Sequence, residues 1–146
     1  MNEKTRFMRA EERILDFLQS KGGCCERREL NKHSIRTLSW MFTDNQIVRI
    51  TFARMDGNKA RRLREAVLFK PEYARKTFVC LNRTAVVRLL MNGLKLPEDM
   101  HHQKAITQFL RECNLTDAEV VAVLWKLGAR NWHRDKTRGN IRICGA

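Results

Sequence analysis

Residues 34–70 read SIRTLSWMFTDNQIVRITFARMDGNKARRLREAVLFK, and this stretch decides the predicted fold. It begins at Ser34, whose hydroxyl can accept a hydrogen bond from an otherwise unpaired backbone N–H at the start of a helix. Apolar residues then recur at helical spacing, which predicts a helix over residues 34–43 with one face in the core. The residues expected on that face are Ile35, Leu38 and Phe42, and those expected nearer to solvent are Arg36, Thr37, Ser39 and Trp40.

The second part of the stretch predicts a hairpin with a basic tip. Residues 48–53 (VRITFA) alternate between apolar and polar or small side chains, a pattern typical of a strand buried on one side. Asp56-Gly57 then favours a tight turn. The returning segment ARRLREAVL (60–68) fits either a strand or a helix. Because its apolar residues also fit a period of two, a strand over 63–70 is predicted.

Upstream of this stretch, two further helices are predicted. Residues 9–21 place apolar side chains at steps of three and four, which indicates an amphipathic helix. Gly22-Gly23 ends it, because the first glycine can adopt the left-handed conformation of a helix C-cap. Residues 26–31 (ERRELN) are short, polar and helix-prone, with Leu30 as their apolar anchor.

Three helices followed by a hairpin resemble a winged helix-turn-helix domain, and the order and size of these elements carry the resemblance over roughly residues 8–70. It implies that residues 22–26 supply a short first strand. It also implies that the third helix enters the major groove of DNA, while the hairpin tip reaches the backbone or the minor groove. The helix contacts implied are His33, Arg36, Thr37 and Trp40, and those of the tip are Arg54, Asn58, Lys59, Arg61, Arg62 and Arg64.

The predicted hairpin tip is also basic enough to need a counter-charge. Four cations lie between residues 59 and 64, and Asp56 alone opposes them. Their mutual repulsion is a cost that a bound polyanion offsets, although any single arginine fits a solvated surface equally well. Trp40 also has two possible roles. It can stack on a base or sugar, or it can lie in the core or at its rim. The usual burial of tryptophan favours the core or the rim.

The rest of the chain predicts a mainly α fold with one or two small hairpins. Residues 71–81 are expected to form a connector and residues 82–146 a helical region. Thr116 and Glu119 have the spacing of a capping box, which marks the start of one helix. Residues 131–134 and 140–144 can then pair into a basic hairpin, or else form a basic tail, and a second winged module is the alternative for this half.

The C-terminal segment is a second candidate surface for nucleic acid. Basic residues interleaved with an aromatic one suit RNA as well as the phosphates of DNA. The candidate contacts are Arg130, Trp132, Arg134, Lys136, Arg138 and Arg142.

The charge of the chain is high and is spread along it. There are 29 Lys and Arg residues against 16 Asp and Glu, a formal net charge of +13. Residues 1–76 hold 18 basic and 10 acidic side chains, and residues 77–146 hold 11 and 6. Both halves are therefore basic, which indicates a shaped binding face for a polyanion and not a basic tail on a neutral domain.

The sequence predicts an intracellular protein, in the cytoplasm and nucleoid or in a nucleus. Residues 1–13 lack the apolar core of a signal peptide, and no run approaches the roughly 20 apolar residues of a membrane span. The five cysteines lack C-x-x-C spacing, so they are read as reduced, mostly structural thiols and not as a disulfide framework or a zinc site.

No catalytic residue, metal site or cofactor is predicted, because paired carboxylates, a phosphate-binding glycine loop and a nucleophile elbow are all missing from the sequence. The leading hypothesis is a non-enzymatic protein that binds duplex DNA, a regulator or an accessory factor of replication or of a mobile element. The alternatives are an RNA-binding subunit of a ribonucleoprotein, a protein-interaction module and a metal-dependent nuclease. Protein partners are expected through residues 82–128, and a membrane is not.

Overall fold

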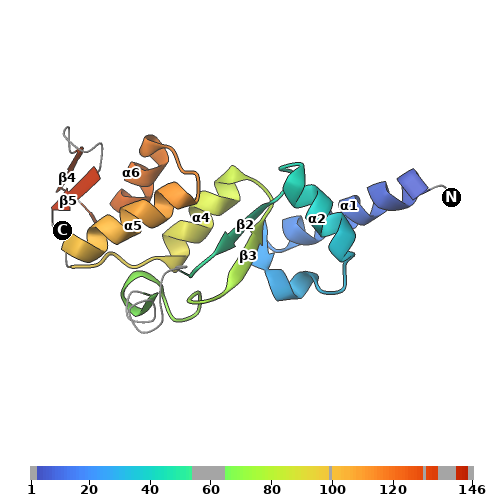
Figure 1. Ribbon diagram of the computed structural model, residues 1–146, viewed down its shortest axis with the longest axis horizontal. Helices are drawn as coiled ribbons and strands as arrows, with labels where there is room; N and C mark the ends of the chain where they lie inside the picture. Colours follow the sequence, from blue (N-terminus) through green and yellow to red (C-terminus); the bar gives the residue numbers. More distant parts are fainter. Residues whose placement is uncertain (1–2, 54–64, 99, 130, 135–140, 145–146) are drawn as a thin grey trace. The chain divides into compact units, whose positions relative to one another are not determined.

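The computed structural model describes residues 3–53, 65–98, 100–129, 131–134 and 141–144, and the side chains of 9–53, 65–98 and 102–129 (Figure 1). This part of the chain is mostly helical, with a small three-stranded antiparallel sheet and a two-stranded one. The chain divides into two compact units, each made of two segments. Unit 1 is residues 1–51 with 75–89, and unit 2 is residues 52–74 with 90–146.

Unit 1 combines helices with the three-stranded sheet. Its elements are α1 (Glu3–Ser20), β1 (Cys24–Glu26), the 3-10 helix η1 (Arg27–Leu30), α2 (Ile35–Thr43), β2 (Val48–Thr51), β3 (Thr77–Cys80) and the first part of α4 (Arg83–Gly93). The strand order is β1-β3-β2, so β3 is central and antiparallel to both neighbours. The short first strand that the resemblance implies at residues 22–26 is thus present as β1.

Local stop signals place the first elements of unit 1 as predicted. Gly22 lies two residues after the end of α1 and has a φ of 79°, the left-handed conformation that ends a helix. The N–H of Gly23 donates to the carbonyl of Leu18 over 2.8 Å, which pairs one of the last carbonyls of the helix. The chain can therefore turn directly from α1 into β1.

A single apolar cluster holds unit 1 together. The side chains of α1, η1 and α2 meet one face of the sheet, and the buried members are Ile14, Leu18, Cys25, Leu30, Leu38, Met41, Ile47 and Val79. Burial of each large aliphatic side chain contributes about 1.5–3 kcal/mol, so this cluster fixes where α2 lies.

The predicted returning strand over 63–70 is wrong. Of this range the structure describes residues 65–70, in which 65–68 are helical and only Phe69 is bridged in the manner of a strand, to Leu94. Good helix formers such as Glu65, Ala66 and Leu68 explain the helix, and the hydrogen bond from Lys95 N–H to the Leu68 carbonyl (2.8 Å) explains why the chain extends just after it. The partner of β2 is instead β3, inside the stretch 71–81 that was expected to be a connector.

Unit 2 contains the remaining part of α4, α5 (Met100–Glu112), α6 (Asp117–Lys126), β4 (Asn131–Arg134) and β5 (Ile141–Cys144). Its core includes a group of aromatic rings, in which Phe69 lies 5.4 Å from Phe52 and 4.9 Å from Phe109. Gly93 packs against this group so closely that an added Cβ would lie 2.7 Å from a ring carbon of Phe52. A larger residue at position 93 would therefore displace the ring.

Two predictions for the second half are confirmed. The hydroxyl of Thr116 accepts from the N–H of Glu119 (3.2 Å), and the Glu119 carboxylate accepts from the N–H of Thr116 (2.9 Å), so the capping box is complete. Residues 131–134 and 141–144 pair antiparallel as the hairpin β4–β5.

Candidate nucleic-acid interface

Helix α2 is fixed at its start by the predicted cap and along its length by the core. The N–H of Thr37 donates to the hydroxyl of Ser34 over 3.2 Å, which confirms Ser34 as the N-cap. Leu38 and Met41, one turn apart, are 1% and 0% exposed. The cap fixes where α2 begins, and the two buried side chains fix its rotation about its axis. The opposite side of the helix must therefore face solvent.

The exposed side of α2, called the α2 face here, consists of Ile35, Arg36, Ser39, Trp40 and Thr43. These positions recur at one, four, five and eight residues from the first, so they share one side of the helix. Ile35 is 73% exposed and Trp40 is 53% exposed. Both values are large for such apolar side chains, and they give the face an apolar part beside its polar one.

The core side of α2 differs from the predicted one. Ile35 was expected inside but is exposed, Phe42 is half-buried, and Thr37 was expected near solvent but is 2% exposed. The helix is rotated because Met41, and not Ile35, joins Leu38 in the apolar cluster. The small side chain of threonine can occupy the edge of that cluster. Thr37 therefore does not belong to the candidate interface.

The other contacts predicted near this helix have different environments. Arg36 lies on the α2 face as expected, and Trp40 lies there too and not in the core. His33 is half-buried, with its ring 5.7 Å from the ring of Phe17. Of these residues, Arg36 and Trp40 are brought together, since residues four apart are neighbours on a helix surface.

Positive charge at α2 has no acidic partner in the described part of the chain. The sequence of α2, IRTLSWMFT, contains no acidic residue. Lys32, which precedes the cap, and Arg36 are both exposed, and neither forms an ion pair with a described residue. On β2, the exposed Arg49 lies over the ring of Phe42, 5.4 Å from its centre. This arrangement leaves the guanidinium charged and accessible.

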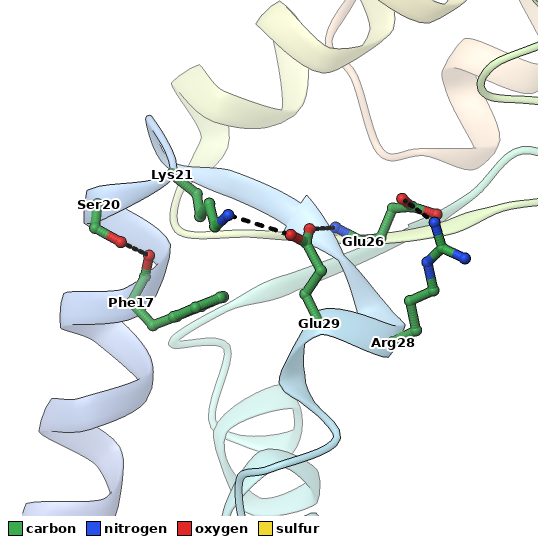
Figure 2. Close-up of polar contacts among 6 residues, drawn as sticks. All are labelled: Phe17, Ser20, Lys21, Glu26, Arg28 and Glu29. Carbon is green, nitrogen blue, oxygen red and sulfur yellow. Dashed lines mark hydrogen bonds and ion pairs between the residues drawn. The ribbon is translucent and has the colours of Figure 1, made fainter.

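Cations near η1 form ion pairs with two glutamates instead (Figure 2). Lys21 Nζ lies 3.3 Å from Glu29 Oε1, and Arg28 Nη2 lies 3.2 Å from Glu26 Oε2. Lys76 Nζ lies 3.6 Å from the other oxygen of Glu26. The two carboxylates thus form ion pairs with three cations, which distinguishes this region of unit 1 from α2.

One of these carboxylates also caps the start of η1. Glu29 Oε2 accepts a hydrogen bond from the backbone N–H of Glu26 over 2.9 Å, within a capping box that the sequence analysis did not identify. This backbone donor, together with Lys21, holds the pKa of Glu29 below its usual value. The spacing of Glu26 and Glu29 was the available signal, because it matches the three-residue step of Thr116 and Glu119.

Several predicted contacts lie outside the described residues. They are the hairpin-tip residues Arg54, Asn58, Lys59, Arg61, Arg62 and Arg64, and the C-terminal residues Arg130, Lys136 and Arg138. Trp132, Arg134 and Arg142 are described by their backbone, which pairs Trp132 with Ile143 and Arg134 with Ile141 in the hairpin β4–β5.

The described surface around α2 also includes residues that the sequence did not indicate as contacts. They are Lys32, Ile35, Ser39 and Arg49. Lys32 and Arg49 had a usable signal. One lies two residues before the N-cap, and the other is on the polar side of the alternating strand. Ile35 had none, because an isoleucine at helical spacing from a leucine indicates a core position.

No protein-family model, curated protein or solved structure matches this chain. Among the described residues, every helix is too short or too polar to cross a bilayer. In the same part of the chain, no three His, Cys, Asp or Glu side chains gather in a way that could hold a metal ion. The fold of unit 1 and the α2 face are the described features that bear on function.

Proposed function

We propose that unit 1 binds nucleic acid, and duplex DNA in particular, through the α2 face, without catalysing a reaction. The observation that carries this proposal is the pairing of an exposed Arg36 with an exposed Trp40 on a helix that has no acidic residue. An arginine can donate two hydrogen bonds to guanine or to a phosphate group. An aromatic ring beside it offers a flat apolar surface to a sugar or a base.

The size and the setting of α2 support the same proposal. An α-helix with its side chains is about 10–12 Å across, and the major groove of B-DNA is about 12 Å wide, so α2 can lie in it. In unit 1, α2 follows α1, β1 and η1 and precedes antiparallel strands, an order that fits the resemblance to a winged helix-turn-helix domain. The hairpin of that domain would be β2–β3, with residues 52–76 between its strands.

Net charge adds a general attraction. Unit 1 has 14 Lys and Arg against 7 Asp and Glu, a difference of +7, and unit 2 has 15 against 9, a difference of +6. Neutralising phosphates with such residues releases counterions, so affinity should fall steeply as salt rises. Net charge alone does not determine which surface of unit 1 binds, so two arginines at different surfaces must be compared.

The test compares Arg36→Ala with Arg28→Ala, which removes the same charge from an exposed position that Glu26 neutralises. We expect Arg36→Ala to weaken binding of a labelled DNA duplex about tenfold and to lower the slope of log K against log salt by about 0.9. Arg28→Ala should change both by much less. Fluorescence anisotropy over a range of salt concentrations measures both quantities.

Equal losses in the two variants would mean that charge acts without a defined face, and an unchanged Arg36→Ala would remove α2 from the interface. Single-stranded RNA added as a competitor at fixed salt would reveal a preference for RNA if it displaced the duplex at lower concentration.

The 73% exposure of Ile35 favours a second candidate, a protein-interaction module. Exposed apolar anchors beside an arginine are typical of the centre of protein interfaces. A protein-interaction module is expected to show no salt-dependent binding to DNA or RNA. The same salt titration therefore separates it from a nucleic-acid-binding protein.

A further inference from the structure

Cys24 and Cys80 face each other across the strands β1 and β3. They are Cα partners in the antiparallel register, and their sulfur atoms lie 3.5 Å apart. The next pair along is bonded, since the N–H of Leu81 donates to the carbonyl of Gly23 over 2.7 Å. Cys24 and Cys80 therefore form a non-hydrogen-bonded pair, in which Cα atoms approach to about 4.5 Å. Disulfides span Cα separations of about 4.4–6.8 Å, so the strands need little movement to be bridged.

The two sulfurs also differ in chemistry in a way that suits oxidation. The thiol of Cys80 donates its hydrogen to the sulfur of Cys24, and this bond lowers the pKa of Cys24 although burial and Glu29 oppose it. A thiolate is the form of cysteine that reacts with oxidants. Cys24 is half-buried and so within reach of a small molecule, whereas Cys80, beside it on β3, is fully buried.

The other cysteines with described side chains lack this combination. Cys25 points to the opposite side of β1, into the apolar cluster of unit 1, and burial raises its pKa to about 12. Burial likewise raises the pKa of Cys113 to about 12. Both are therefore almost fully protonated at neutral pH, whereas the pKa of Cys24 is lowered.

We propose that Cys24 and Cys80 form a redox modification site that a peroxide converts into a disulfide joining β1 to β3. The Cys24 thiolate attacks one oxygen of the peroxide, the O–O bond breaks, and a sulfenic acid and hydroxide form. The Cys80 sulfur then attacks the sulfenic sulfur, loses its proton and expels a second hydroxide, which leaves as water. For hydrogen peroxide, two thiols and one peroxide give one disulfide and two waters, and a dithiol reductant reverses the change.

The bond would stabilise unit 1 as a whole. It would close a loop that contains η1, α2 and β2, and a cross-link over so long a loop strongly restricts the unfolded chain. The proposal does not depend on nucleic-acid binding, because it concerns two sulfurs of the sheet and not the α2 face.

The experiment treats the reduced full-length chain with a small excess of hydrogen peroxide. We expect loss of two free thiols per chain and a tryptic cross-link between residues 22–27 (GGCCER) and 77–83 (TFVCLNR). A rise in Tm of roughly 10 °C, reversed by dithiothreitol, should accompany it. Cys25→Ala serves as the matched control, because it should keep the cross-link and so assign it to Cys24. Cys24→Ala should abolish both the cross-link and the rise in Tm.

A cross-link that disappears in Cys25→Ala, one that forms only between chains, or oxidation of Cys24 to a sulfinic acid without a cross-link would overturn the proposal. Mass spectrometry of the wild-type chain decides among these outcomes even if a variant folds poorly.

Discussion

Helices α2 and α6 are built alike but present different surfaces. Each begins at a hydroxyl N-cap, Ser34 or Thr116, and each is followed in the chain by a strand. Trp40 on α2 is 53% exposed and Trp125 on α6 is 52% exposed. The charges differ, because α2 has Arg36 and no acidic residue, whereas the first turn of α6 has Asp117 and Glu119.

Both helices expose a tryptophan, and their charges distinguish the two surfaces. Asp117 and Glu119 suit the positive end of the dipole of α6, and Asp117 also lies 3.6 Å from Arg111. A phosphate group approaching the start of α6 would meet those carboxylates, and one approaching α2 would not. Charge at the helix start separates the two surfaces more clearly than their apolar residues do.

The largest effect is expected for the residues that set the rotation of α2. Met41→Ala should lower the free energy of unfolding by about 2–5 kcal/mol, because it leaves a cavity in the apolar cluster of unit 1. Ile35→Ala on the same helix should change it by about 0.5 kcal/mol or less, since Ile35 is 73% exposed. Urea titration measures both. If Ile35→Ala proved the costlier change, α2 would have the rotation that the sequence predicted.

An intermediate effect is expected for the two tryptophans. Trp40→Ala should weaken duplex binding by up to about tenfold, about 1.4 kcal/mol, and Trp125→Ala should leave it nearly unchanged. Anisotropy of the same labelled duplex provides the measurement, and the Tm of each variant controls for folding. Similar losses for both would end the contrast between α2 and α6 and extend the interface to unit 2.

The smallest effect is expected for Glu29. Its pKa is lowered in the folded chain by the Glu26 backbone N–H and by Lys21, so its charged form contributes stability above the usual value of 4.5. That contribution is lost as the pH falls through the lower folded value. Because Glu29 is exposed, the effect should be small.

The measurement is the Tm at pH 7 and at pH 3. The wild-type chain should lose slightly more than Glu29→Gln, which keeps the side-chain shape but cannot ionise. An identical loss in both would show that the box at η1 contributes nothing through its charge.

Features fixed by a few neighbouring residues could be predicted from the sequence. The N-cap Ser34, the stop at Gly22 and the box of Thr116 and Glu119 are examples, because each depends on residues at most five apart in the chain. The hairpin β4–β5 belongs with them. On the candidate interface, Arg36 was correctly placed at the surface.

Features that depend on distant residues could not be predicted. β3 has four residues without alternation, and it is a strand because it pairs on both sides, with β1 and with β2. The rotation of α2 was decided by Met41 meeting a cluster that includes α1 and β3, so no pattern within the helix distinguished Ile35 from Thr37. The helix at residues 65–68 was an open alternative that propensity favoured.

The central place of β3 has a consequence for the order in which the chain can fold during synthesis. A nascent chain that ends at residue 74 has β1 and β2 but not the strand that lies between them. By then it already contains residues 52–74, which belong to unit 2. Unit 1 can complete its sheet only after part of its neighbour has been made, so the two units cannot be finished strictly one after the other. Until residue 80 is added, two unpaired strand edges remain open to wrong partners.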